Sequence, residues 1–491
     1  MHTRAAAADS RSSGADPRRW RILVVSQLCG FMSLLDVSIV NVALPSIQRG
    51  LGASAAQVQW VVSGYALAFG LALVPAGRLG DALGRRRMFL VALSAFIVTS
   101  ALAGAAPTAT LLVVARLAQG LAGGMLPPQN AGLIQDLFRG AERARAFGVF
   151  GATVGLSTAV GPIVGGLILA GFGGAGGWRW VFFVNIPVGL LALVAAIRLL
   201  PRQAPGGPLL ARLDFAGAAL LCAGVLAVLL PLVSASSGGL RRLWWLFPAA
   251  VVLFAAFARW EVWLSRRGRS PLLEPRLLTG TPGYPAGAAL GLSYFVGFSG
   301  IWLVLALHFQ RGLGYSPLHS GLSVTPFAVG SAVASAAGGR LVSRLGRRLT
   351  VLGLVLTAGG LGAAALVLDA TTGTAAGLAA AAPLLVAGVG SGFVILPNIT
   401  LSLQAVPVSM AGAAGGALQT GQRVGAAIGS AALAAIFYSV LAGDGGYQAA
   451  IAWSLAGAVA FILIALALGV ADLRRDGRRR RASAAAEEHW S

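Results

Sequence analysis

The sequence predicts an all-α protein that crosses a membrane many times. Hydrophobic residues make up 57% of the 491-residue chain and charged residues only 11%, a composition that does not suit a soluble globular domain. The apolar residues come in continuous runs of about 20, the length that a helix needs to cross a hydrocarbon core of about 30 Å. These runs lack the alternation of a membrane β-strand, which excludes an outer-membrane barrel.

Fourteen apolar runs follow one another along the chain, separated by segments with Arg, Gly or Pro. We expect transmembrane helices at 22–45, 57–76, 88–106, 110–132, 146–170, 181–197, 215–236, 243–258, 286–309, 317–339, 349–368, 375–397, 410–440 and 447–471.

The placement of the positive charge predicts the orientation. With the amino terminus in the cytoplasm, most of the 37 basic residues fall in cytoplasmic segments, as the positive-inside rule requires. The external exceptions are Arg49, Arg179, Arg241, Arg242 and Arg311. An even number of spans then places both termini in the cytoplasm, where the basic tail meets membrane lipid and not nucleic acid. The absence of lysine, with abundant Ala, Gly and Arg, suggests a bacterial cell membrane protein.

An internal repeat divides the chain. The segment GGRLVSRLGRRLTV at 338–351 repeats the Gly and Arg spacing of AGRLGDALGRRRMF at 76–89, and such repeats are typical of two helical bundles that alternate about a site at mid-membrane. The stretches 198–212 and 259–285 are rich in loop residues or basic residues and mark linkers. We therefore expect a disordered cytoplasmic leader at 1–20, an N-terminal six-helix bundle at 21–200, a linker with two extra transmembrane helices at 201–280, a C-terminal six-helix bundle at 281–471 and a basic cytoplasmic tail at 472–491.

Asp36 is the only acidic side chain inside the predicted spans, midway along the first. A charge near the bilayer centre costs about 2.5 to 3.5 kcal/mol on insertion scales, so an intramembrane acid usually faces a cavity or a partner and often relays protons. Asp36 therefore indicates ion-coupled transport. Arg116 lies in the fourth span and keeps its charge, so it either has a buried acceptor or snorkels to the interface.

The residues of known catalytic and metal sites do not cluster in this sequence. Cys29 and Cys222 lie in separate spans, and the four histidines are scattered. No Ser/His/Asp, paired-carboxylate or metal-ligand pattern is visible. We expect a protein that is not an enzyme, that holds no metal or cofactor and that uses a proton gradient as its energy source.

Several motifs occur together in order: LDVSIVNVALP at 35–45, GRLGDALGRRR at 77–87, VVARLAQGLAGG at 113–124, GATVGLSTAVGPIVGGLI at 151–168, WRWVFFVNIPVG at 178–189 and QTGQRVGAAIG at 419–429. Together they resemble the major facilitator superfamily and, within it, the fourteen-span drug:proton antiporters, over about residues 20 to 470. The resemblance implies two six-helix bundles joined by two extra helices. It also implies multidrug efflux, antibiotic resistance and alternating access driven by protons.

The resemblance assigns roles to residues of the first half. Asp36 and Arg116 become the proton-coupling pair. Gly77, Asp81, Gly84 and Arg85 become a conformational latch, in which Asp81 accepts from helix-end amides or pairs with an arginine; the alternative is that Arg86 and Arg87 only mark topology. In the repeat copy Ser343 replaces the acid, which argues against a second latch. The antiporter motif comprises Gly155, Gly161, Pro162, Gly165 and Gly166, whose small faces permit close approach to the other bundle.

Lipophilic substrates need apolar area and a few orienting polar groups. We expect substrate contacts from Asn41, Gln119, Asn130, Tyr294, Phe298, Trp302 and Gln419, although the three aromatic residues share one helix face and fit a packed or lipid-facing stripe equally well. Arg423 is a second-half charged site, in a Gln422-Arg423 order that reverses the usual order of the family. We expect a monomer.

Two other functions are compatible with the sequence. An exporter or importer of one specific metabolite would use the same scaffold. A sensor or channel that does not transport uphill belongs to a different class, and a flux measurement separates it from an antiporter.

Overall fold

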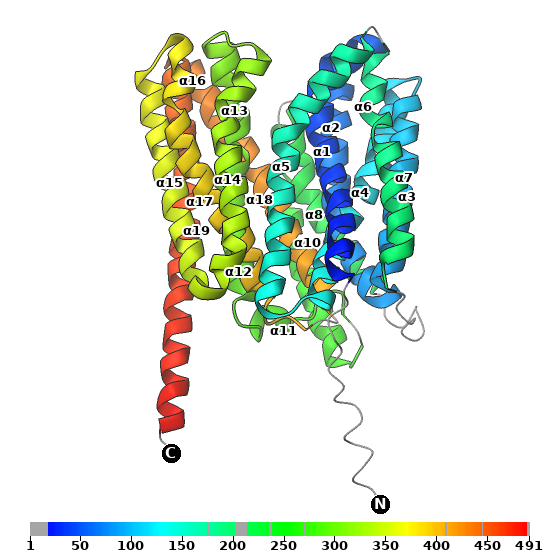
Figure 1. The fold of residues 1–491 in the computed structure, drawn as a ribbon, viewed down its shortest axis with the longest axis vertical. Helices are drawn as coiled ribbons and strands as arrows, with labels where there is room; N and C mark the ends of the chain where they lie inside the picture. The colour runs from blue at the N-terminus through cyan, green and yellow to red at the C-terminus, as the bar shows by residue number, and fades with distance from the viewer. Residues whose placement is uncertain are drawn as a thin grey trace, which may run out of the picture.

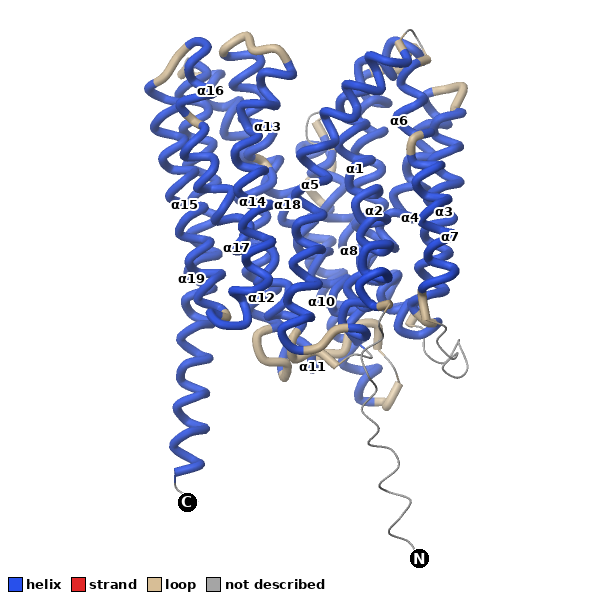
Figure 2. Tube along the Cα trace, in the orientation of Figure 1, coloured by secondary structure: helices blue, strands red, loops and turns tan. Residues whose placement is uncertain are grey.

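The computed structural model describes residues 18–173, 176–201, 214–234, 238–269, 271–407, 410–443 and 445–488. These residues form helices joined by short turns, with no strand among them (Figure 2). Thirteen helices within the described ranges are long and apolar enough to cross a membrane, and α5 (Gly140–Phe172) is a further long helix beside them (Figure 1). The all-α membrane fold is confirmed, while the count of fourteen spans stays a prediction.

The first half of the molecule contains the helices that precede the linker. They are α1 (Arg19–Leu51), α2 (Ala55–Leu83), α3 (Arg85–Ala105), α4 (Ala109–Leu137), α5, α6 (Trp180–Phe183) and α7 (Asn185–Leu199). The last predicted span of this half is thus broken into α6 and α7, with a short 3₁₀ turn (Gly177–Arg179) before it.

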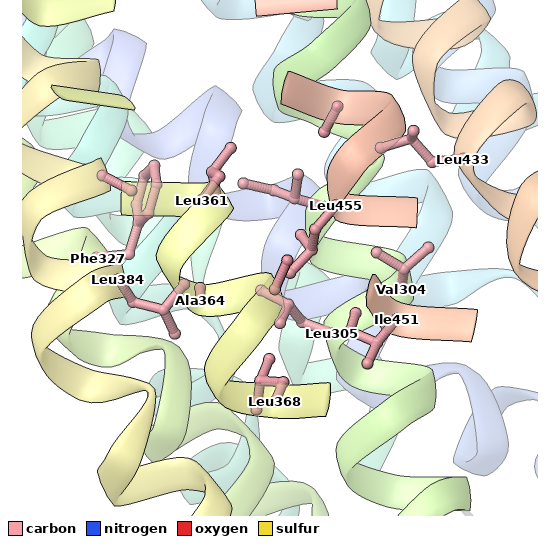
Figure 3. Packing of buried hydrophobic residues seen from close by; sticks show 14 of the residues in the cluster. Val304, Leu305, Phe327, Leu361, Ala364, Leu368, Leu384, Leu433, Ile451 and Leu455 are labelled. Atoms are coloured by element: carbon pink, nitrogen blue, oxygen red, sulfur yellow. The ribbon is translucent and has the colours of Figure 1, made fainter. Parts of the chain in front are cut away.

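The second half contains α12 (Tyr284–Ser299), α13 (Ile301–Leu307), α14 (Pro317–Leu345), α15 (Arg347–Ala370), α16 (Ala376–Ala379), α17 (Ala381–Leu403), α18 (Ala411–Ala442) and α19 (Gly446–Glu488), with a π-turn at His308–Gly312 and a 3₁₀ turn at Gly373–Ala375. Its core is built from aliphatic, aromatic and small residues, among them Phe327, Leu361, Leu384 and Leu455 (Figure 3). The predicted leader lies outside the described residues apart from its last positions.

Two long helices, α8 (Phe215–Val233) and α10 (Leu246–Arg266), lie between the halves in sequence, with the short turns α9 (Gly239–Arg242) and α11 (Arg276–Thr279). Apolar residues of α8 pack against both α2 and α18. The extra pair therefore covers the seam between the two halves. Most of the predicted linker 198–212 lies outside the described residues.

Local chemistry fixes where the helices begin. Ser54 starts α2 with a reciprocal capping box, since its Oγ accepts from the Gln57 amide and the Gln57 side chain accepts from the Ser54 amide. The turns that join α2 to α3 and α14 to α15 consist of a single glycine each, Gly84 with φ of 95° and Gly346 with φ of 53°. Because only glycine adopts positive φ without strain, this shared turn explains the glycine spacing of the sequence repeat.

One expectation about the spans is wrong. α10 continues to Arg266, beyond the predicted end at 258, so Glu261 is inside a long helix and only 2% exposed. Its side chain and that of Asp214 share one buried site near the ends of α10 and α8. Asp36 is therefore not the only acid within a long apolar helix, although it lies midway along its own helix α1. The sequence missed Glu261 because the apolar run stops before the helix does.

The two halves meet at one end and diverge toward the other (Figure 1). At the end where α1 begins and α19 leaves the bundle, a single apolar cluster joins residues of both halves, including Phe147 and Phe150 of α5 with Leu396 and Leu403 of α17. We call this the closed end. The start of α1 and the end of α19 lie on the same side of the molecule, which agrees with the even number of spans.

Candidate functional site

Asp36 lies inside the first half and is completely buried. Its Oδ2 accepts a hydrogen bond from Nη1 of Arg116, with which it forms an ion pair. Its Oδ1 accepts from Nε2 of Gln119 at 3.1 Å and from Nδ2 of Asn185 at 2.9 Å. Three donors from α4 and α7 therefore converge on one carboxylate, an arrangement that suits its ionised form, because an ionised carboxylate is an acceptor only.

Arg116 is also fully buried, so the snorkelling alternative is wrong. Besides Asp36, it donates from Nε to the Val61 carbonyl at 3.0 Å and from Nη1 to Oε1 of Gln119 at 2.8 Å. Its guanidinium carbon lies 4.2 Å from the centroid of the Tyr65 ring. The cation thus links α1, α2 and α4, and its main electrostatic partner is Asp36.

The sequence reasoning missed Asn185. It is the first residue of α7, directly after the break with α6, and it bridges Asp36 and Ser100 with its Nδ2, which lies 3.1 Å from the Ser100 Oγ. The available signal was an amide within the apolar motif at 178–189, two residues before a proline. Gln119, expected to bind substrate, instead belongs to the Asp36 network and is enclosed.

Asp81, which the sequence places in a predicted latch, has partners at the start of α18. Its oxygens accept from the main-chain amides of Gly412 at 3.2 Å and Ala413 at 3.0 Å. The first amides of a helix have no intrahelical acceptor and carry partial positive charge, so a carboxylate there is stabilised. Within its own half, Asp81 pairs with Arg85 at 3.2 Å. The latch, defined as Asp81 and Arg85 with the amides of Gly412 and Ala413, therefore joins the two halves at the closed end.

Arg85 anchors the latch to α4. It pairs with Asp136 at 2.8 Å and donates to the carbonyl of Gly132. Glycines allow the halves to come this close, because a Cβ added to Gly77 would lie 2.3 Å from the Gly412 carbonyl oxygen. Gly84 serves the turn through its positive φ. Arg86 donates to the Ile197 carbonyl at 2.7 Å, within its own half.

The repeat copy in the second half forms no equivalent latch, as Ser343 indicated. Ser343 is exposed and donates to the carbonyl of Arg340 at 2.8 Å, within its own helix. Arg347, at the position of Arg85, pairs with Asp472 at 2.7 Å and donates to Oδ1 of Asn398 at 2.7 Å. Both partners belong to the second half, so these contacts stabilise one bundle.

Two glycines of the antiporter motif in α5 lie against α1 of their own half. A Cβ on Gly161 would lie 2.2 Å from Cβ of Ser38, and one on Gly165 would lie 3.2 Å from the Ile39 carbonyl oxygen, both in α1 of the same half. Gly166 has nothing within 4 Å of that position. In this conformation Gly161 and Gly165 pack within the first half, while Gly151 at the start of the motif segment lies against Leu396 of the second half, where an added Cβ would lie 3.3 Å from the Leu396 Cβ. The contacts of Gly155 and Pro162 lie outside the described residues.

The remaining candidates for substrate contact divide into core and partly exposed residues. Tyr294 is enclosed and donates to Oγ of Ser391 at 2.8 Å, so it is a core residue and the packed-stripe alternative applies to it. Asn130 is likewise enclosed and donates to the Ser26 carbonyl at 3.1 Å. Asn41 is exposed, and the other three are partly buried: Phe298, Trp302 and Gln419. Phe298 and Trp302 pack beside the second-half core.

The sequence matches the Major Facilitator Superfamily over residues 28–430 and 287–491. The chain belongs to this superfamily. It is therefore a transporter and not an enzyme. The probable actinorhodin transporter of Streptomyces coelicolor is 38% identical over 446 residues, which cover 88% of this chain and 75% of that protein. Puromycin resistance protein pur8 of Streptomyces alboniger is 37% identical over 86% of this chain and 82% of its own length.

A solved structure shows the same fold. A human organic anion transporter aligns with a TM-score of 0.67 at 16% sequence identity, over 92% of this chain and 100% of that one. At this identity the likeness shows the arrangement of helices and nothing about the cargo. The predicted superfamily fold is thus confirmed, and the relatives of this superfamily member include proteins named for antibiotic transport and resistance.

Proposed function

We propose that this transporter is a proton-coupled antiporter that exports lipophilic drugs or antibiotics across the cell membrane of a bacterium, as a monomer with both termini in the cytoplasm. The observation that carries the proposal is the enclosed Asp36, held by three donors with Arg116 as its counter-charge. The names of the relatives support antibiotics as the class of cargo. The exchange of a proton for a drug molecule is our inference from the site.

Protonation of Asp36 would change the hydrogen bonds and the charge balance around it. When Asp36 takes up a proton, the carboxyl group loses its charge, and Arg116 loses the ion pair that balances its buried cation. One oxygen also becomes a donor that faces the donors of Gln119 and Asn185. The network must then rearrange across α1, α4 and α7. Protonation therefore favours a different packing of the first half, which is the requirement for coupling.

The latch connects the protonation of Asp36 with the side of the membrane to which the transporter is open. With the termini in the cytoplasm, the closed end faces the cytoplasm and the divergent ends face outward. In this state substrate leaves and a proton enters from outside. Opening toward the cytoplasm requires Asp81 to leave the amides of Gly412 and Ala413, and the energy comes from the proton gradient. Each charge that crosses the membrane contributes about 2.3 kcal/mol per 100 mV.

Uptake into everted membrane vesicles tests the proposal. In these vesicles the cytoplasmic face is outside, so export appears as accumulation in the lumen. Vesicles with an acidic lumen should accumulate members of a panel of fluorescent lipophilic antibiotics and dyes, and collapse of the gradient should release them. Asp36→Asn should abolish gradient-driven accumulation but retain exchange of labelled for unlabelled compound, because exchange needs no proton turnover.

Asp369→Asn is the matched control, since Asp369 is exposed at the end of α15. It should transport like the unaltered protein. Normal gradient-driven accumulation by Asp36→Asn would exclude proton coupling through this residue. Equilibration without uphill accumulation by the unaltered protein would instead indicate a channel.

A further inference from the structure

Arg423 of α18 reaches from the second half to the first. Its guanidinium carbon lies 4.5 Å from the centroid of the Phe69 ring in α2. Its neighbour Gln422 faces α12 of its own half. A Cβ added to Gly291 of α12 would lie 3.7 Å from Nε2 of Gln422. The order Gln422-Arg423 therefore directs the cation, and not the amide, onto the first half.

Arg423 lies on the seam between the halves, about three turns of helix from the closed end. α18 approaches α2 closely at Gly416, where a Cβ would lie 2.5 Å from the Leu73 carbonyl oxygen, and it remains beside α2 at Arg423, whose Cβ would lie 3.9 Å from a Cβ on Gly70. Phe69 and Asp81 are separated by about 18 Å along α2, at a rise of 1.5 Å per residue. Because the hydrocarbon core is about 30 Å thick, Phe69 lies near the middle of the membrane if Asp81 lies at its edge. Arg423 is only partly buried. The positive charge is thus placed deep in the membrane at the seam between the halves without being fully enclosed.

Arg423 differs from the other deep arginines because it has no counter-charge. Arg85, Arg116 and Arg347 each pair with a carboxylate. Within the described part of the chain Arg423 forms no ion pair and no hydrogen bond, and its guanidinium lies over the aromatic face of Phe69. The oxygens of Asp36, the carboxylate at mid-span, are already occupied by three donors.

The local charge is therefore unbalanced. Asp36 and Arg116 cancel, which leaves the single positive charge of Arg423. A cation removed from water without a counter-ion is destabilising, and the face of Phe69 offsets only part of this cost. Apolar residues lie nearby, since Val424, which follows Arg423 in α18, packs with Leu67 of α2 and Leu229 of α8. An apolar surface with one fixed cation is complementary to a lipophilic anion.

We propose that the exported compounds carry an anionic group, such as a carboxylate, sulfonate or phenolate, which binds Arg423 while the apolar body lies against the Phe69 side of the seam. This inference rests on the proposed drug export and defines the substrate class of the same pathway. The proton site and the substrate site are then separate, because Asp36 already has its partner in Arg116. A cationic compound would find no free carboxylate here.

Three probes with one aromatic body test the charge preference: pyrene sulfonate, pyrene sulfonamide and a pyrenylmethyl trimethylammonium ion. Their charges do not change over the working pH, so protonation of the probe cannot account for a difference. Binding to the purified protein is measured by energy transfer from its 11 tryptophans, and transport by uptake into everted vesicles. The sulfonate should bind about tenfold or more tightly than the sulfonamide.

Arg423→Gln should weaken sulfonate binding by about tenfold or more and leave the sulfonamide unchanged, while Arg423→Lys should retain part of the preference. Thermal stability and size-exclusion profiles check folding. Equal losses for both probes, or no preference in the unaltered protein, would overturn the inference. Transport of the cation and the amide but not the sulfonate would also overturn it and leave drug export standing. Transport of none of the three would contradict the proposed export of lipophilic compounds itself.

Discussion

Replacing Asp81 by asparagine should shift the protein away from the conformation described here. Asp81 accepts from the amides of Gly412 and Ala413 at the start of α18. Hydrogen bonds to a charged group contribute about 1.5 to 3 kcal/mol each, and a charge at a helix start adds about 0.3 to 1 kcal/mol. Asparagine keeps one acceptor oxygen without the charge, so we expect a net loss of about 2 kcal/mol from the closed state.

That loss changes the ratio of separated to closed molecules by about 30-fold. A protein with about 1% of its molecules separated would then show about a quarter separated. Spin labels at Arg139 and Arg344, which are exposed on the two halves near the closed end, would report the change as a second, longer distance. The labels require a background in which Cys29 and Cys222 are replaced.

Asp472→Asn is the control for this measurement, because Asp472 pairs with Arg347 inside the second half. It should leave the distance distribution unchanged. An unchanged distribution in Asp81→Asn, or an equal shift in both variants, would refute the assignment of the latch as the contact that holds the halves together.

Three further predictions follow from single contacts. Gly77→Ala should abolish transport in a folded protein, because its Cβ would overlap the closed end, whereas Gly166→Ala, with open space around it, should transport normally in the same vesicles. Asn185→Ala removes one of the three donors to Asp36, so gradient-driven accumulation in the same vesicles should fall while Asp369→Asn leaves it unchanged; normal accumulation by Asn185→Ala contradicts this role. Oε1 of Glu261 is buried and has no hydrogen-bond partner among the described residues. Glu261→Gln places an amide group there that can donate a hydrogen bond, so this variant should have a higher Tm at pH 8 but not at pH 5. A lower Tm of the variant at pH 8 would argue against this interpretation of the site.

The ion pair of Asp36 and Arg116 could be predicted from the sequence because its chemistry is local. A single carboxylate in an apolar run is conspicuous, and Arg116 needs a partner of opposite charge wherever the chain folds. Asn185 could not be assigned in the same way, because an amide in an apolar span fits packing as well as function. Its role depends on the break between α6 and α7, which places it against Asp36.

The contacts between the halves could not be predicted from the sequence. Asp81 and Ala413 are 332 residues apart. The motif around Asp81 shows that its carboxylate can accept hydrogen bonds, but it gives no information about which distant amides donate them. The same applies to Arg423, whose direction depends on the rotation of α18 and not on the motif around it. The repeat was informative about the glycine turns at Gly84 and Gly346, since φ there is a local property.

Substrate-driven proton movement tests the central claim most directly. In liposomes with purified protein and a pH-sensitive dye in the lumen, addition of a transported compound outside should make an acidic lumen more alkaline, as protons leave in exchange. Asp36→Asn should show no such signal while still exchanging labelled for unlabelled compound. A proton signal of full size in that variant would contradict the assignment of Asp36 as the proton carrier.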